Sequence, residues 1–321
     1  MKSLSAALLA LSLLDGLPAY VFKACVGHVR LLRATRPIER VLQDPAVHEE
    51  VKSRLRLVEE VRRFGIETMG FSPGRSYTAY AEVPGAYVTL AVTACRKTAF
   101  EPYEWWFPFL GRLPYKGYFD PEDARREARR LEAEGYDVSF MEVAAYSTLG
   151  WTADPVLSTM MGYPPGRLAE IILHEMAHSA VYFKGRTEFN ESAATFLGEA
   201  GAAEFIRGRF GEGSAQWREF SASRRRRRSR SRVLMALYGE LSALYASGAG
   251  EERMLLLREK AFARARKALA WGAGRPLNNA VVLGHRRYHR ETREFERLHE
   301  SLGRDWKRTL QALKESKTLI E

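Results

Sequence analysis

The residues whose types and spacing could do chemistry lie between Leu168 and Phe196. His174 and His178 are four positions apart, so on a helix their imidazoles share one face, about a turn apart, where both can bind one metal ion. This is the spacing of a zinc site. Glu175 follows the first histidine, where its carboxylate could take a proton from a metal-bound water. The pattern therefore predicts a metal centre that activates water.

A catalytic zinc ion also needs a third protein ligand and an open position for water. Glu191 could supply that ligand from a second helix after the turn at residues 184–186. Glu199 is an alternative, because eight positions at about 100° each bring it within about 80° of the same face. Apolar neighbours make the first helix largely buried, and such polarity inside it needs a reason. Core histidines satisfied by hydrogen bonds, beside a surface glutamate, are the other interpretation.

Several segments are similar to known proteins. The pair HEMAH and FNESAA resembles the gluzincin metallopeptidases, and the wider set resembles a bacterial family of predicted zinc aminopeptidases. The similar segments are residues 31–45, 60–70, 113–120, 134–140, 145–160, 173–201 and 244–248. The resemblance implies a peptidase that binds Zn²⁺ through His174, His178 and Glu191. Glu191 is preferred over Glu199 because an adjoining asparagine, Asn190, and the small residues that follow match the family motif.

The resemblance also implies roles around the metal. Glu175 would act as the general base, and Asn190 would orient the site from behind the ligands. Tyr288 falls where the family carries a tyrosine, whose hydroxyl could donate a hydrogen bond to the oxyanion of the tetrahedral intermediate.

Substrate contacts are predicted on both sides of the motif. In related enzymes an edge strand pairs with the extended substrate backbone, and residues 143–150, with Ala145 and Tyr146, are the candidate here. The small residues of this stretch could equally pack under a helix. Glu188 could bind the α-ammonium group of a substrate, which would make the enzyme an aminopeptidase.

The rest of the chain predicts an α+β fold: a mostly helical, zincin-like metallopeptidase with a small antiparallel sheet beside the histidine helix. Strand character is concentrated in residues 77–83, 87–94 and 136–146, while helical periodicity follows Asp44 and Asp120 and dominates the second half. Residues 26–321 are expected to form a single domain with a helical C-terminal part.

Residues 1–25 have the character of a targeting or tethering segment. A short basic head precedes an apolar run of signal-peptide length, which is shorter than the roughly 20 residues that span a bilayer. We therefore expect export to the bacterial cell envelope, either into the periplasm or tethered to a membrane. A buried N-terminal helix is the alternative.

The chain carries 50 basic and 39 acidic residues, a net charge of +11. Residues 224–228 are consecutive arginines, a pattern found in nucleic-acid-binding segments. The run continues into an apolar helix without interleaved aromatic residues, so a solvated helix face near anionic lipid headgroups is favoured. The expected partners are therefore a peptide substrate and a membrane surface, and no nucleic acid is expected.

A non-catalytic envelope protein with a structural zinc site is the alternative function. Structural zinc sites usually have four ligands and often include cysteine. Cys25 and Cys95 lie far from the histidine motif in sequence. Peptide hydrolysis is therefore the preferred prediction.

Overall fold

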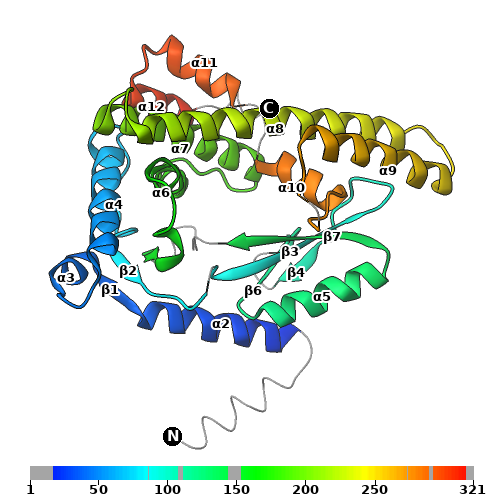
Figure 1. The fold of residues 1–321 in the computed structure, drawn as a ribbon, viewed down its shortest axis with the longest axis horizontal. Helices are drawn as coiled ribbons and strands as arrows, with labels where there is room; N and C mark the ends of the chain where they lie inside the picture. The colour runs from blue at the N-terminus through cyan, green and yellow to red at the C-terminus, as the bar shows by residue number, and fades with distance from the viewer. Residues whose placement is uncertain are drawn as a thin grey trace, which may run out of the picture.

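The computed structural model describes residues 17–85, 87–107, 111–143, 153–272, 274–288 and 292–315, which form a mostly helical α+β fold (Figure 1). The helices up to the histidine motif are α2 (Leu17–Arg33), α3 (Ile38–Gln43), α4 (Glu49–Glu67), α5 (Pro121–Ala133), the 3₁₀ helix η1 (Ser158–Met160) and α6 (Pro165–Ala180). The helices that follow are α7 (Thr187–Phe210), α8 (Ala215–Tyr245), α9 (Glu251–Ala268), α10 (Asn279–Tyr288), α11 (Arg293–Ser301) and α12 (Trp306–Glu315).

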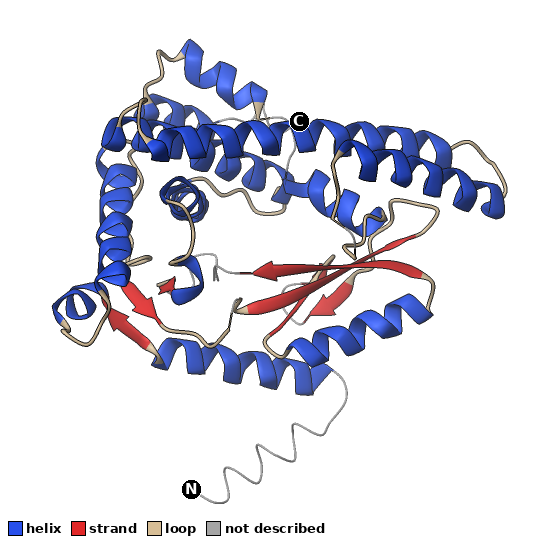
Figure 2. Ribbon diagram, viewed as in Figure 1, coloured by secondary structure: helices blue, strands red, loops and turns tan. Residues whose placement is uncertain are grey.

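The strands of the described ranges form small sheets, which Figure 2 shows in red. Their bounds are β1 (Thr35–Pro37), β2 (Ala79–Ala81), β3 (Thr89–Arg96), β4 (Trp105–Phe107), β5 (Gly111–Leu113), β6 (Lys116–Tyr118), β7 (Tyr136–Val143) and β8 (Val156–Leu157). The order β6-β3-β7 gives an antiparallel sheet, in which Leu90 is opposite Tyr118 on one side and Glu142 on the other. β2 pairs antiparallel with β1 and parallel with β8, and β4 pairs with β5. Strand β7 is therefore at an edge of its sheet.

Helix α6 lies in the largest apolar core of the described chain. Its fully buried residues Leu168, Ile172 and Leu173 belong to one cluster with residues of α4, α7, β2 and β8. The antiparallel sheet has a separate core, which it shares with α5, and α10 lies over its other face (Figure 1). The expected antiparallel sheet is present, but α6 shares its core with the mixed sheet of β1, β2 and β8.

Capping chemistry explains where two of the helices begin. Helix α5 starts at Pro121, as expected, because the Asp120 carboxylate accepts a hydrogen bond of 2.9 Å from the backbone N–H of Glu122. The helix expected to follow Asp44 begins later, at Glu49. Asp44 instead closes α3, so the capping carboxylate marks the end of one helix rather than the start of the next.

Helix α2 packs on the antiparallel sheet. The Tyr20 hydroxyl donates to the Gly117 carbonyl at 2.9 Å, and Lys23 forms an ion pair of 2.8 Å with Asp123 on α5. The segment expected to be signal-like therefore contains residues that contact the folded part of the chain. Within the described ranges, no helix combines the length and the apolar character needed to cross a membrane.

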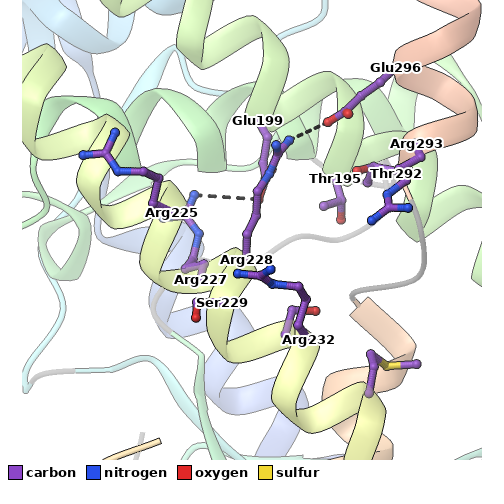
Figure 3. A pocket seen from close by; sticks show the side chains of 12 residues that line it. Thr195, Glu199, Arg225, Arg227, Arg228, Ser229, Arg232, Thr292, Arg293 and Glu296 are labelled. Atoms are coloured by element: carbon purple, nitrogen blue, oxygen red, sulfur yellow. Dashed lines mark hydrogen bonds and ion pairs between the residues drawn. The ribbon is translucent and has the colours of Figure 1, made fainter.

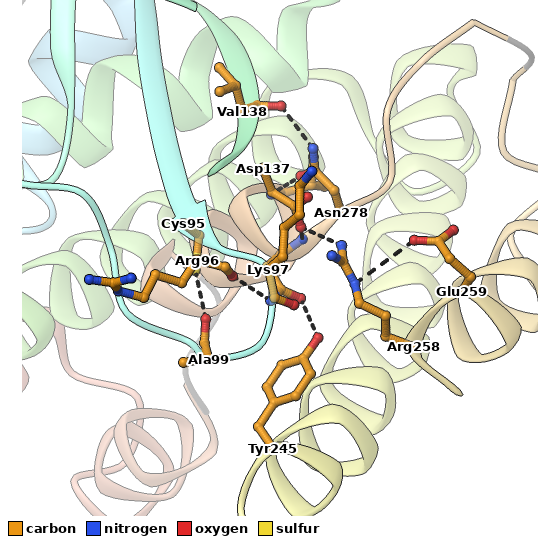
Figure 4. A network of polar contacts seen from close by, with 12 residues as sticks. Cys95, Arg96, Lys97, Ala99, Asp137, Val138, Tyr245, Arg258, Glu259 and Asn278 are labelled. Carbon is orange, nitrogen blue, oxygen red and sulfur yellow. Dashed lines mark hydrogen bonds and ion pairs between the residues drawn. The ribbon is translucent and has the colours of Figure 1, made fainter. Parts of the chain in front are cut away.

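A polar network holds the antiparallel sheet to the C-terminal helices (Figure 4). Asp137 on β7 accepts a hydrogen bond of 2.9 Å from the backbone N–H of Asn279 and pairs with the buried Arg258 of α9. The Asn279 side chain donates to the Arg96 carbonyl at 2.8 Å and accepts from the Tyr245 hydroxyl at 2.9 Å. These residues therefore hold the antiparallel sheet against α8, α9 and α10.

Candidate metal centre

Helices α6 and α7 bring three ligand-type side chains together. Nε2 of His174 lies 3.7 Å from one carboxylate oxygen of Glu191, and Nε2 of His178 lies 3.7 Å from the other. One ligand atom from each residue can be chosen so that all three lie within 4.8 Å of one another. In a tetrahedral zinc site with bonds of about 2.0–2.2 Å, ligand atoms are about 3.3–3.6 Å apart. The three residues therefore fit a zinc-sized ion after a small adjustment.

A glycine allows α7 to approach α6 closely at this point. A Cβ at Gly198 would lie 2.9 Å from the Glu170 carbonyl oxygen and 3.0 Å from Cβ of His174. Gly198 and Glu191 are seven positions apart, so they share one face of α7. A side chain at position 198 would thus push the helices apart directly beside the ligands.

Asn190 fixes the loop between the two helices. Its amide nitrogen donates to the Phe183 carbonyl at 2.8 Å, and its amide oxygen accepts from the Phe183 N–H at 2.9 Å. The residue is buried. Since Glu191 is the next residue, these two hydrogen bonds give Asn190 a means of positioning the carboxylate through the loop.

The two imidazoles differ in their affinity for a proton. Burial, and then the charge of His174, lowers the pKa of His178 to about 4, so this ring is neutral at pH 7 and can donate its lone pair to a metal. Burial also opposes protonation of His174, but the facing carboxylate of Glu191 and the charge of Glu175 outweigh it and raise the pKa. A metal ion would therefore compete with a proton for His174.

The other predicted site residues have varied positions. Glu175 lies on α6 between the two histidines and is partly buried, while Glu188 is exposed in the first turn of α7. Tyr288 is the last residue of α10. Its side chain, and all of Ala145 and Tyr146, lie outside the described residues, so their predicted contacts with substrate stay predictions.

Glu199, the alternative third ligand, faces the arginines of α8 instead. Its carboxylate lies 3.6 Å from Nε of Arg224 and 3.7 Å from Nη2 of Arg227. Buried Glu170 on α6 accepts hydrogen bonds of 2.7 Å from both Arg227 and Arg167. The expectation of a solvated arginine face is therefore wrong for Arg224 and Arg227, which are partly buried ion-pair partners of the metal-site helices.

Tyr77 is a residue that the sequence did not single out. It is buried, has a φ of 61°, and its hydroxyl has no hydrogen-bond partner among the described residues. Burial, and then the charges of Glu175 and Asp154, raise its pKa well above the usual value. A protonated hydroxyl thus lies near the predicted base. Tyr77 lies in a stretch of strand-like residues, and nothing in that local sequence predicts that it lies near Glu175.

The described residues supply three ligands and no fourth histidine, cysteine or carboxylate within reach, which is the ligand number of catalytic zinc sites. The chain belongs to the family described as "Putative aminopeptidase", whose family model matches residues 19–320. Neither the curated proteins nor the solved structures include a significant match. The family name suggests a peptidase that removes N-terminal residues.

Proposed function

We propose that the protein is a zinc-dependent metallopeptidase with aminopeptidase activity and a zincin-like arrangement of helices around the metal. The observation that carries the proposal is the convergence of His174, His178 and Glu191 from two packed helices, with Glu175 on the same helix as the histidines. The family to which the chain belongs supports the aminopeptidase part.

When bound, Zn²⁺ would supply a Lewis acid and an acidified water molecule. The residues of the chain itself then transfer the proton and position the metal ligands. The Glu175 carboxylate accepts a proton during attack on the scissile carbonyl and returns it to the leaving amine. Asn190 keeps Glu191 in place through its two hydrogen bonds to Phe183. Tyr288 is proposed to donate a hydrogen bond to the oxyanion.

The proposed substrate is a peptide in extended conformation. Strand β7 pairs with β3 on one side, and its exposed residues Phe140 and Met141 lie near its C-terminal end. Substrate backbone could add to the edge of β7 that no described strand covers, beyond Val138, whose carbonyl accepts from Asn278. Ala145 and Tyr146 would continue the contact in sequence. Glu188 is proposed to bind the α-ammonium group.

Export to the cell envelope and contact with a membrane surface are proposed from the character of residues 1–25 alone. The alternative of a structural zinc site would require a closed set of ligands, whereas three are found among the described residues. The ligand number therefore favours catalysis over a purely structural metal.

The test is cleavage of an aminoacyl substrate and an internally quenched peptide by the wild type and by Glu175→Gln. We expect the wild type to cleave the aminoacyl substrate, and a chelator to abolish cleavage until zinc is restored. Loss of the general base should lower kcat by about 10²- to 10⁴-fold while the metal stays bound. Full activity in Glu175→Gln would contradict the mechanism, and cleavage of the internal peptide alone would contradict the aminopeptidase assignment.

A further inference from the structure

A concave site lies between α7, α8 and α11, and none of the three proposed metal ligands lines it (Figure 3). Its volume is about 690 Å³, which falls within the roughly 300–1,000 Å³ of small-molecule sites. Arginine is the commonest residue of its lining, with Arg225, Arg227, Arg228, Arg232 and Arg293. The arginine run, for which the proposed function has no use, therefore forms one wall of a cavity.

The acidic residues of the lining neutralise only part of this charge. Glu296 on α11 accepts a hydrogen bond of 2.6 Å from Arg228, and Glu199 lies 3.7 Å from Arg227. Each of the two carboxylates thus already pairs with an arginine. The pocket keeps a positive excess because it has more guanidinium groups than carboxylates.

Two arginines of the pocket have no partner in the described chain. Arg225 and Arg232 are exposed, and neither forms a hydrogen bond or ion pair with any described residue. Together with Arg228 they are spaced three and four positions apart, so all of them lie on one face of α8. Guanidinium groups gathered around a cavity create a local positive potential that attracts anions.

The concave shape of the pocket and its hydrogen-bond donors indicate which kind of anion it binds. Arginine presents a planar fork of N–H donors that matches phosphate oxygens, and the hydroxyls of Thr195 and Ser229 add neutral donors to the lining. A nucleic-acid backbone needs an extended basic surface, whereas these arginines line a hollow. We infer that the pocket binds a small, multiply charged phosphate compound, for which inorganic pyrophosphate is the simplest probe.

The pocket adjoins the metal centre without sharing its ligands. Thr195 and Glu199 lie one and two turns beyond Glu191 on α7, so an occupant would contact the same helix. Binding there requires neither zinc nor peptide. Binding of a phosphate compound can therefore be tested independently of the proposed peptidase activity.

The test is a calorimetric titration of inorganic pyrophosphate into the full-length protein. We expect saturable binding at one site, and at least about tenfold weaker binding in Arg225→Ala and in Arg232→Ala. Arg226→Ala is the matched control, since it removes the same charge from an exposed neighbour outside the lining, and it should bind as the wild type does. Glu191→Gln, which removes a proposed metal ligand, should also bind as the wild type does.

Several outcomes would overturn the inference. They are absence of saturable binding, an equal loss in Arg226→Ala, which would indicate unspecific charge, and loss of binding in Glu191→Gln, which would place pyrophosphate on the metal. Citrate serves as a second probe, and tighter binding of citrate than of pyrophosphate would reject a phosphate site. Binding to anionic lipid vesicles but not to pyrophosphate would identify a membrane-facing surface instead.

Discussion

Carboxylates along the contact between α6 and α7 have two opposite kinds of partner. Glu191 faces the imidazoles of His174 and His178, whereas Glu170 and Glu199 face guanidinium groups of α8. An imidazole can lose its proton and become a metal ligand, but a guanidinium group cannot. The arginine neutralises a carboxylate that pairs with it, so the partners that the neighbouring helices offer determine which carboxylate can bind a metal.

Burial makes the arginine partners necessary. Burial, the largest effect, raises the pKa of Glu170, while the charges of Arg167 and Arg227 act to lower it. If one arginine is removed, the buried carboxylate must take up a proton or lose its place. The arginine pairs therefore support the part of α6 that precedes the metal ligands.

The largest change in stability is expected when Arg227 is replaced. Arg227→Met removes one of the two guanidinium groups on Glu170 and leaves a carboxylate that is 7% exposed with Arg167 as its remaining partner. We expect a loss of about 2–3 kcal/mol in the free energy of unfolding, slightly below the usual value for a broken buried pair because one partner remains. Urea denaturation measures this loss.

Arg226→Met is the control for that experiment. Arg226 is the adjacent arginine and is exposed. We expect its replacement to change stability by less than about 0.5 kcal/mol. Equal effects of the two substitutions would mean that the arginine run acts only through its total charge.

The next effect concerns the distance between the helices. Gly198→Ala places a Cβ 2.9 Å from a backbone carbonyl oxygen of α6, and moving that backbone costs free energy. We expect a loss of about 1–2 kcal/mol in stability and weaker zinc binding, because α7 must move away from the histidines. Gly208→Ala on the same helix meets nothing within 4 Å and should be neutral or stabilising by up to about 1 kcal/mol. Unchanged zinc affinity in Gly198→Ala would show that the spacing has no effect on the site.

The smallest effect is the pH dependence of stabilisation by zinc. In the metal-free protein His178 has a pKa of about 4, so its contribution to stability is present above the unfolded value of about 6.5 and is lost as the pH falls through the folded value. The pKa of His174 is raised, so its contribution is present below the unfolded value and is lost as the pH rises through the folded one.

A metal ion requires both rings without a proton. We therefore expect the increase in Tm on adding zinc to become larger as the pH rises from about 6 to about 8, because protons compete for His174 at the lower pH. Thermal scans with zinc and with a chelator measure this increase. An increase that does not depend on pH would contradict a role for His174 as a ligand.

The sequence predicted the elements of the site well. The spacing of His174 and His178 predicted one helix face, and the turn before Glu191 predicted a second helix, because both depend on local periodicity and turn residues. The α+β class is confirmed, and so is the helix that begins after Asp120. These features are local, and short-range chemistry determines them.

The sequence did not predict the features that depend on contacts between residues far apart in the chain. Periodicity could not separate Glu191 from Glu199, since the distinction depends on the arginines of α8 that lie beside Glu199. For the same reason the sequence could not show which arginines of the run pair with carboxylates of α6 and α7 and which are exposed. Tyr77 is near Glu175 only through the tertiary fold, although nearly one hundred residues separate them in sequence.

The most direct measurement is the zinc content of the wild type, Glu191→Gln and Glu199→Gln after purification and dialysis, with folding checked by circular dichroism. The account predicts one equivalent of zinc in the wild type and in Glu199→Gln, and none in a folded Glu191→Gln. Zinc retained in Glu191→Gln and lost in Glu199→Gln would show that Glu199, and not Glu191, is the third ligand. A wild-type protein that binds no zinc would contradict the metal centre altogether.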